Sequence, residues 1–288
     1  MLFSIIIPTF NNFKYFKVTI ESILENSSYK HEIITHINGV DSETEEYLKK
    51  ENLPFTKSEI NIGLCSGVNT ASELSSTDFI LYSHDDMYFL PDWDKFLENE
   101  LKKFDHNLYY LSLTQISHLK GKKNDLQHIH FDCGSTINTF DKSKLLNNYY
   151  KFDFRDLQGS HWAPHLIHKK MWKKIGGFSE EFNPGFASDP DLNFKLWNEG
   201  VRVFKGVSKS RIYHFGSVTT RNNQKIKRNN GKKTFLLKWG ISINFFTKYY
   251  LRRGSVFKGP LQNPHKNLFY YLDLVICKIQ YFLAKFFS

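Results

Sequence analysis

Short apolar runs alternate with amphipathic segments along the first ninety residues of the chain. The apolar runs are rich in β-branched residues and stop at proline, glycine or polar residues, which predicts buried strands. The segments between them repeat apolar residues at helical spacing. This alternation predicts βαβ units, and hence an α/β fold with a mostly parallel central sheet. The strands are expected at residues 3–7, 32–37, 55–58 and 79–83, and the helices at 13–24, 42–50 and 64–74.

The pattern is less regular between residues 90 and 220, and residues 118–160 read as loops. One helix stands out because Ser188 or Asp189 is placed to cap it, Pro190 falls in its first turn and Gly200 follows its end. The helices are expected at residues 91–104, 169–175 and 188–199, and the strands at 109–116, 163–168, 201–204 and 211–214.

Beyond residue 220 a polar, basic linker leads to two aromatic and basic segments, 235–251 and 268–287, that read as helices. In the second, seven apolar residues share one face, which is typical of a helix lying at a membrane surface and equally of a helix packed back onto the body. We therefore expect a body at 1–220, with halves 1–117 and 118–220, and an extension at 221–288. The shared face comprises Leu268, Leu272, Val275, Ile276, Ile279, Leu283 and Phe286.

Charge is unevenly distributed along the chain. Residues 201–288 hold 18 of the 39 Lys and Arg but only one of the 29 acidic residues, Asp273. A basic end on a more acidic body indicates a polyanionic partner, either anionic lipid or nucleic acid. We favour a membrane surface, because no base-reading motif is present. No nucleic acid is therefore expected as partner.

Cysteine usage and the absence of targeting signals predict a reducing, cytoplasmic compartment, with peripheral attachment to the inner face of a membrane. The three cysteines are far apart and odd in number. The first residues lack the basic region and cleavage site of a signal peptide. No uncharged apolar run is long enough to predict a spanning helix.

Two adjacent carboxylates, Asp85 and Asp86, directly follow the apolar run at 79–83. In an open α/β sheet this is the edge where ligands bind. Paired oxygen donors there suit a divalent cation that carries phosphates, although a solvated turn would show the same pair.

Four stretches resemble the inverting glycosyltransferases of the GT-A fold, family 2 (GT2). The likeness covers roughly residues 3–220, and it rests on the order and spacing of motifs that are weak singly. The stretches are Ser4-Ile-Ile-Ile-Pro-Thr-Phe-Asn11; Asn61-Ile-Gly63 with Gly67 and Asn69; Ser83-His-Asp-Asp86; and the set Gly176–Phe182, Ser188–Asp191 and Tyr213–Ser217.

The resemblance implies transfer of a hexosyl or hexosaminyl group from a nucleotide-diphosphate sugar to a glycan or lipid-linked acceptor, in cell-surface polysaccharide synthesis. Asp86 and His214 would hold Mn²⁺ or Mg²⁺ against the diphosphate. Asp189 would be the catalytic base, kept ionised by its helix N-terminus. Trp162 and Asp191 would contact the acceptor. The donor-binding residues implied are Pro8, Thr9, Asn11, Asn38, Asn61, Gly63, Asn69, His84 and Asp85.

The chain departs from the family pattern at three positions. The acidic residue expected after the second strand falls at Ile37, with Asn38 next, which leaves the nucleotide base open. His84 stands where the first carboxylate of the metal motif is expected. Ser188 stands where an acidic residue is expected, directly before the catalytic base Asp189.

Three other interpretations fit parts of the sequence. A zinc site could form from His128, His130 and Asp132, with Cys133 and His161, His165 and His168 nearby, but its spacing matches no common framework. We prefer to interpret that stretch as an acceptor-site loop. A sugar-phosphate nucleotidyltransferase would need a glycine-rich basic loop where Thr9–Asn12 stands. A non-catalytic nucleic-acid-binding protein would use the aromatic, basic end.

Overall fold

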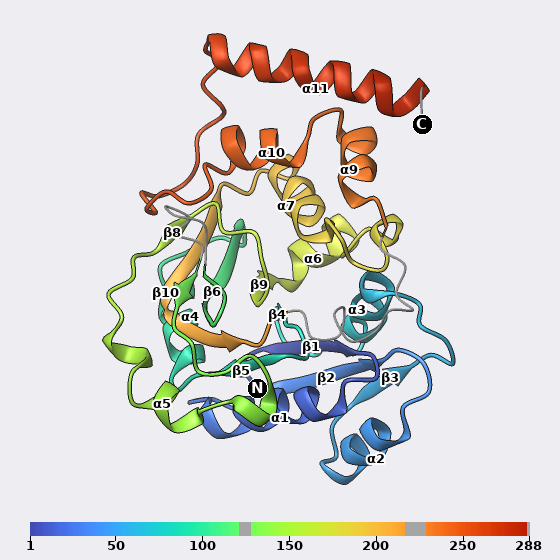
Figure 1. Ribbon diagram of the computed structural model, residues 1–288, viewed down its shortest axis with the longest axis vertical. Helices are drawn as coiled ribbons and strands as arrows, with labels where there is room; N and C mark the ends of the chain where they lie inside the picture. The colour runs from blue at the N-terminus through green and yellow to red at the C-terminus, as the bar shows by residue number, and fades with distance from the viewer. Residues whose placement is uncertain (121–127, 217–228, 287–288) are drawn as a thin grey trace.

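The computed structural model describes residues 1–120, 128–216 and 229–286, and these form an α/β fold around one large sheet (Figure 1). The described strands make a ten-stranded sheet with the main order β3-β2-β1-β4-β9-β6-β10-β5, while β7 pairs with β6 and β8 with β10. The strands are β1 (Ser4–Thr9), β2 (Glu32–Ile37), β3 (Phe55–Lys57), β4 (Phe79–Tyr82), β5 (Met87–Phe89), β6 (Tyr109–Ser117), β7 (Ile129–His130), β8 (Leu157–Gln158), β9 (His165–His168) and β10 (Val203–His214).

Strand direction brings several strand ends to one edge of the sheet. β1 is parallel to both β2 and β4. β9 runs antiparallel to β4 on one side and to β6 on the other, so β6 points the same way as β4. β10 is parallel to β6. The C-terminal ends of β1, β4, β6 and β10 therefore lie along the same edge, which is where an open α/β sheet binds its ligands. The expected mostly parallel sheet is confirmed.

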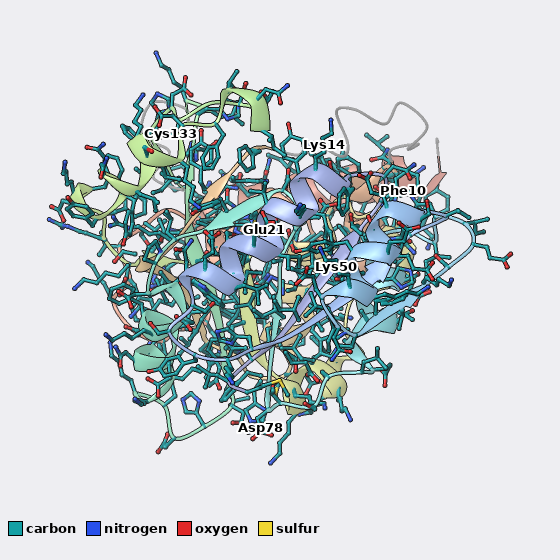
Figure 2. All side chains as sticks on the ribbon, turned by 90° about the horizontal axis from the view of Figure 1, so that it is seen from below. Phe10, Lys14, Glu21, Lys50, Asp78 and Cys133 are labelled. Atoms are coloured by element: carbon teal, nitrogen blue, oxygen red, sulfur yellow. The ribbon has the colours of Figure 1, made fainter. Side chains whose placement is uncertain are left out.

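Helices cover both faces of the sheet. α1 and α2 lie on one side, as the view from below shows with Glu21 on α1 and Lys50 at the end of α2 (Figure 2), and α3, α6 and α7 lie on the other side (Figure 1). Apolar strand residues such as Ile5, Ile7 and Leu81 are fully buried between these layers. The helices of the body are α1 (Phe13–Asn26), α2 (Ser42–Lys50), α3 (Leu64–Ser72), α4 (Trp93–Leu101), α5 (Lys142–Leu146), α6 (Lys169–Ile175) and α7 (Ser188–Asn198).

One expectation about the second half differs from the structure. The two short strands expected at 201–204 and 211–214 are one strand, β10, whose register against β6 shifts between Val207 and Arg211. The polar residues of this bulge make the strand look interrupted in the sequence. Within the bulge, the Arg211 side chain donates a hydrogen bond to the Ser208 carbonyl. Residues 128–160, expected as loops, carry only short elements such as α5 between loops, and they pack around a second apolar cluster that includes Phe140, Tyr213 and Phe215.

The C-terminal extension packs on α7 through aromatic side chains. α9 (Gly231–Trp239) ends at Gly240, whose φ of +71° breaks the single helix expected at 235–251. α10 (Ile243–Phe245) and a π-helical turn (Phe246–Tyr250) follow, and α11 (Leu268–Phe286) lies across them. The ring of Phe194 on α7 stands 4.6 Å from that of Trp239 and 4.8 Å from that of Phe246. The apolar core therefore continues from the sheet into the extension.

None of the described helices is long and apolar enough to cross a bilayer.

Candidate active site

The ends of β1 and β4 are joined by a buried hydrogen bond. Thr9 is the last residue of β1, and its hydroxyl donates to Oδ2 of Asp85 across 2.8 Å. Both side chains are nearly inaccessible, at 2% and 6% exposure. This bond fixes the turn that follows β4. Pro8, which precedes Thr9 in β1, is also buried. Thr9 and Asp85, both expected at the donor site, thus lie together at the ligand-binding edge.

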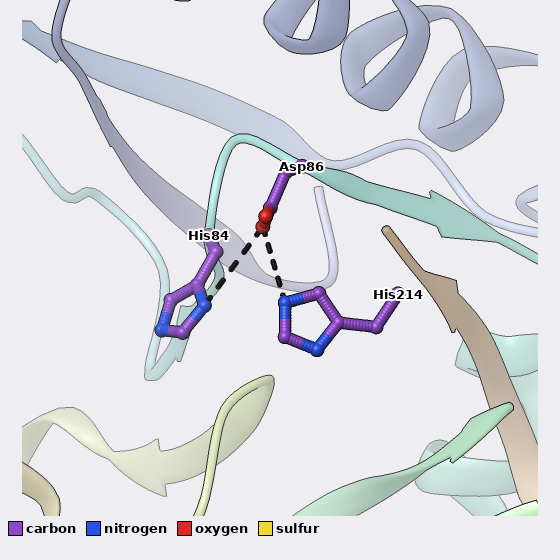
Figure 3. A group of neighbouring side chains, drawn as sticks. All are labelled: His84, Asp86 and His214. Carbon is purple, nitrogen blue, oxygen red and sulfur yellow. Dashed lines mark ion pairs between the residues drawn. The ribbon is translucent and has the colours of Figure 1, made fainter. Parts of the chain in front are cut away.

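Asp86 lies between two imidazole rings at that edge (Figure 3). Its Oδ1 is 3.3 Å from Nε2 of His214 and 4.0 Å from Nδ1 of His84. His214 reaches it because β10 ends there, paired with Met87 of the antiparallel β5. The backbone is tied at the same point, since the amide of Phe215 donates to the Asp86 carbonyl. One ligand atom from each of the three side chains falls within 4.8 Å of the others.

Gln115 sets the orientation of His214. Its Oε1 lies 3.3 Å from Nδ1 of His214, so a proton on Nδ1 completes this hydrogen bond and leaves Nε2 as the lone-pair atom of the neutral tautomer. That Nε2 is buried and makes no hydrogen bond within the described residues. Gln115 belongs to β6, the strand next to β10, where it pairs in register with Ile212, two residues before the histidine. This arrangement leaves Nε2 of His214 facing Asp86.

The three side chains fit a divalent metal ion. Burial lowers the pKa of His84 to about 4 in spite of the Asp86 charge, so its ring is neutral at pH 7, as a ligand must be. Two imidazole nitrogens and one carboxylate suit a transition ion better than Mg²⁺, which prefers oxygen donors. His84, expected to contact the donor, is placed by the structure among these ligand atoms.

Asp189 lies in the first turn of α7, but the structure corrects how that turn is made and charged. The helix is capped by Ala187, whose φ is +69°, and neither Ser188 nor Asp189 caps it. Burial raises the pKa of Asp189 to about 7. The expectation that the helix N-terminus keeps it ionised is corrected, because the loss of solvation outweighs the helix dipole. A carboxyl that titrates near neutrality is suited to accept a proton.

A small cavity lies against Asp189. It has a volume of about 260 Å³ and is lined by Gln115, His128, His161, Trp162, Asp189 and Pro190. Gln115 is shared, because the same side chain contacts His214. Oδ1 of Asp189 is buried and makes no hydrogen bond to any described residue. Asp189 and Trp162 line one cavity, and Gln115 of the same cavity contacts His214.

Asp191 does not face this cavity, and its expected role at the acceptor is corrected. The carboxylate is fully buried. Its Oδ1 accepts a hydrogen bond from Nε1 of Trp239 at 2.8 Å and lies 3.0 Å from Nζ of Lys238. Because side chains two positions apart on a helix point in different directions, Asp189 and Asp191 serve opposite sides of α7. Asp191 attaches the extension.

The amides expected at the donor site make internal contacts. Asn69 donates to the carbonyl of Phe178 and accepts from its amide, so both ends of the side chain are engaged. Oδ1 of Asn38 accepts from the amide of Ile62, and Oδ1 of Asn61 accepts from the amide of Gly63. Asn38 and Asn61 shape the loop before α3, and Asn69 joins α3 to the segment after α6, structural roles that the motif alone does not reveal.

Gly63 allows a close approach, but to a side chain of the same protein. Its φ is +89°, and a Cβ there would lie 2.4 Å from the Asn183 side chain. Oδ1 of Asn183 accepts from the amide of Cys65 in the first turn of α3. The glycine therefore makes room for a residue that caps α3 from a distant part of the chain.

A second hollow lies beside the ends of β1 and β2. It has a volume of about 550 Å³ and is lined by residues 11–15 and 40–43, including the exposed Asn11. Asp41 on its rim caps α2 by accepting from the amide of Thr44. The connections after two parallel strands meet here, so Asn11 stays a candidate for contact with a base or ribose.

The described histidines outside the Asp86 cluster do not assemble a zinc site. The one group of three or more possible ligands found in the described residues is His84, Asp86 and His214. His165 is buried in β9 with its pKa lowered to about 3, and His168 accepts from the amide of Lys170 at the start of α6. His128 lines the Asp189 cavity instead.

Gln115 is the site residue that sequence reasoning missed. The sequence could have pointed to Gln115 only through its position near the end of the strand expected at 109–116. Nothing in the sequence shows that this strand pairs with the strand that ends at His214.

Comparisons with known proteins agree with this fold. The chain has the fold of S. aureus TarS residues 1–349, with a TM-score of 0.56 at 15% identity over 74% of this chain and 60% of that one. It also has the fold of GalNAc-T7, solved with UDP, GalNAc and Mn²⁺, with a TM-score of 0.60 at 13% identity over 86% of this chain and 50% of that one. The chain thus spans less than two thirds of either structure.

No curated protein matches the chain in sequence. The model of the family described as glycosyl transferase family 2 matches residues 4–172, which is more than half of the chain. The match includes β1, Asp85 and Asp86 at the site edge, and the strand that carries Gln115. The chain therefore belongs to glycosyl transferase family 2.

Proposed function

We propose that the protein transfers a hexosyl or hexosaminyl group from a nucleotide-diphosphate sugar to a hydroxyl of a glycan or lipid-linked acceptor, with inversion, in cell-surface polysaccharide synthesis. The observation that carries this proposal is the shared use of Gln115 by the Asp189 cavity and the histidine cluster. Gln115 lines the cavity of the proposed proton acceptor and also contacts His214 of the candidate diphosphate site. That combination is what a single displacement at an anomeric carbon requires.

Asp189 is the proposed base. Its carboxylate takes the proton of the acceptor hydroxyl while that oxygen forms a bond to the anomeric carbon and the bond to the diphosphate breaks. Its unpaired, buried Oδ1 is available to accept that proton, and its pKa of about 7 leaves a large ionised fraction at neutral pH. The half-buried Trp162 in the same cavity offers a flat apolar surface for a sugar ring.

His84, Asp86 and His214 are the proposed ligands of a divalent metal ion, with Mn²⁺ favoured by the two imidazoles. A bound divalent ion would neutralise the diphosphate leaving group. Thr9 holds Asp85 beside this group, and Asn11 lies at the hollow next to β1. GalNAc-T7, a structure of similar fold, was solved with UDP and Mn²⁺, which supports this choice of donor class and ion.

Calorimetric titration of UDP, GDP, CDP and dTDP, each with Mn²⁺, with Mg²⁺ and with neither, tests the proposal. Binding of one nucleotide that depends on Mn²⁺ is expected, and it would name the donor base. An Asp86→Asn variant should lose the dependence on metal, whereas His265→Asn, an exposed histidine in the extension, should retain it. Equal and weak binding of all four nucleotides under every condition would refute the donor site.

A further inference from the structure

α11 presents an apolar surface to solvent along its whole length. Ten large hydrophobic side chains of this helix are each more than half exposed, whereas the other exposed hydrophobic residues of the described chain are scattered over residues 1–256. A contiguous surface of this kind is uncommon on a soluble protein and marks an interaction site. The ten residues, called here the outer face, are Leu268, Phe269, Tyr271, Leu272, Val275, Ile276, Ile279, Phe282, Leu283 and Phe286.

The opposite side of α11 holds the helix onto the body. Tyr270 and Cys277 are buried, and they lie two helical turns apart on the inner side. The Tyr270 ring stands 5.0 Å from that of Phe245, and the Asp273 carboxylate accepts hydrogen bonds from Lys248 and the Tyr249 hydroxyl. α11 therefore lies lengthwise across α9 and α10, on the side away from the sheet (Figure 1). Of the two interpretations left open by the sequence, packing of the apolar stripe onto the body is excluded, because the stripe faces outward.

The outer face contains no charged residue. At 100° per residue its ten members span an arc of about 160°. Lys278 and Lys285 border this arc on one side, and both are exposed. Lysine side chains at the border of an apolar helix face can keep their charge in water while their stems contact lipid. The arrangement is that of a helix lying in a membrane interface.

Charge decides between lipid and a second copy as the occupant. The single acidic residue of the extension, Asp273, is paired with Lys248, so it does not offset the surrounding cations. Exposed basic residues occur throughout the described extension, at Lys232, Arg252, Arg253, Lys258, Lys266, Lys278 and Lys285. Two copies joined through the outer face would bring two basic extensions together, which costs free energy, whereas anionic lipid attracts them.

We propose that the outer face of α11 is a docking surface for an anionic membrane, with the helix lying parallel to the bilayer and Lys278 and Lys285 at headgroup level. The proposal does not depend on the reaction catalysed. It concerns a surface carried by the extension, on the opposite side of α9 and α10 from the sheet edge that holds Asp86.

Co-sedimentation of the full chain with vesicles of phosphatidylcholine, with and without phosphatidylglycerol, tests it. The full chain should bind the phosphatidylglycerol vesicles and release from them in high salt. The double variant Ile279→Asp with Leu283→Asp should bind roughly 100-fold more weakly, because two apolar contacts are replaced by charges. The matched control, Leu24→Asp with Leu74→Asp, changes two exposed hydrophobic residues outside α11 and should bind as the unmodified chain.

Further measurements separate the remaining outcomes. Lys278→Glu with Lys285→Glu should reduce the preference for phosphatidylglycerol. Thermal unfolding and nucleotide titration show that each variant is folded, and nucleotide binding should be unchanged whether or not docking is lost. Equal vesicle binding by the Ile279 and Leu283 variant and the control would overturn the proposal. So would a dimer, seen by sedimentation velocity without lipid, that dissociates in that variant alone.

Discussion

Nε1 of Trp239 donates a hydrogen bond to Oδ1 of Asp191 across 2.8 Å, and this contact joins the C-terminal extension to the helix turn that carries Asp189. Lys238 adds its charge to the same oxygen and also pairs with Glu181. A fully buried carboxylate needs such partners, because an uncompensated charge in the interior is costly. The extension is thus connected to the proposed base through one turn of α7.

Removing the indole donor should lower turnover without changing donor affinity. In Trp239→Phe the Asp191 carboxylate loses a hydrogen bond, which should reduce the unfolding free energy by about 1–2 kcal/mol. The displaced first turn of α7 should reduce kcat several-fold while the KM for the donor stays constant. Lys238→Met should have a larger effect of the same kind, whereas Lys232→Met, exposed on the same helix, should behave as the unmodified protein. Unchanged kcat in Trp239→Phe would show that Asp191 has a role in folding alone.

Each ligand of the histidine cluster should contribute to metal dependence. Asp86→Ala removes the charged ligand and should abolish metal-dependent turnover. His84→Ala should weaken the apparent affinity for Mn²⁺ and leave residual activity at high Mn²⁺, because two ligands remain. Activity measured across a Mn²⁺ titration distinguishes the two. A His84→Ala variant with the Mn²⁺ requirement of the unmodified protein would return His84 to the donor-contact role expected from its sequence position.

Gln115 should affect the metal affinity of this site although it is not one of the proposed ligands. Gln115→Leu keeps a similar volume but removes the acceptor for Nδ1 of His214, and loss of such a partner costs about 10–100-fold in metal affinity. Gln115→Glu retains an acceptor and should restore affinity. Direct Mn²⁺ binding in the absence of nucleotide is the measurement. Equal affinities for the Leu and Glu variants would show that orientation of His214 does not depend on this contact.

Local patterns in the sequence predict much of this fold because its strands and helices are each marked by periodicity and punctuation. The run at 3–7 and the helix at 188–199 appear within a residue or two of their expected places, and Asp86 lies at the sheet edge as its position after β4 implies. The break at Gly240 is less visible, because a glycine within a helical pattern is often tolerated.

Features that depend on distant contacts could not be predicted in this way. Gln115 contacts His214 only because β6 pairs with β10, which lies nearly a hundred residues further along the chain. The partner of Gly63 is Asn183, and that of Asp191 is Trp239. The ionisation of Asp189 follows from burial by surrounding elements, whereas the sequence shows only the helix start, which argues for the opposite shift.

Gly63 should prove important for stability more than for donor affinity. In Gly63→Ala the new Cβ meets Asn183, and the residue must also hold a φ of +89°, which disfavours any side chain. We expect a loss of about 2–4 kcal/mol in unfolding free energy from the combined strain and clash. Gly176→Ala is a matched control that should lose less, because Gly176 also has a positive φ but a Cβ there would meet no atom within 4 Å. Equal losses would show that the clash with Asn183 is relieved.

The pH dependence of transfer should report the Asp189 carboxyl. A base must be ionised, so kcat/KM should fall about tenfold per pH unit below a pKa of about 7 and level off above it. Asp189→Asn should remove transfer and leave nucleotide binding nearly intact. A profile that stays flat down to pH 5 would mean that another group takes the proton.

Stability should change with pH in the opposite sense at the same residue. Burial raises the pKa of Asp189 from its ordinary value of 3.8 to about 7, so the folded state holds this proton more tightly than the unfolded chain does. Folding is then penalised progressively as pH rises from about 4 to 7, and fully above 7. Asp189→Asn, which cannot ionise, should therefore be more stable than the unmodified protein near pH 8 by about 2–4 kcal/mol, with little difference near pH 4. Urea unfolding of both proteins at the two pH values measures this directly. A difference that is the same at both pH values would mean that Asp189 is solvated and strongly acidic, and its assignment as a base poised near neutrality would be wrong.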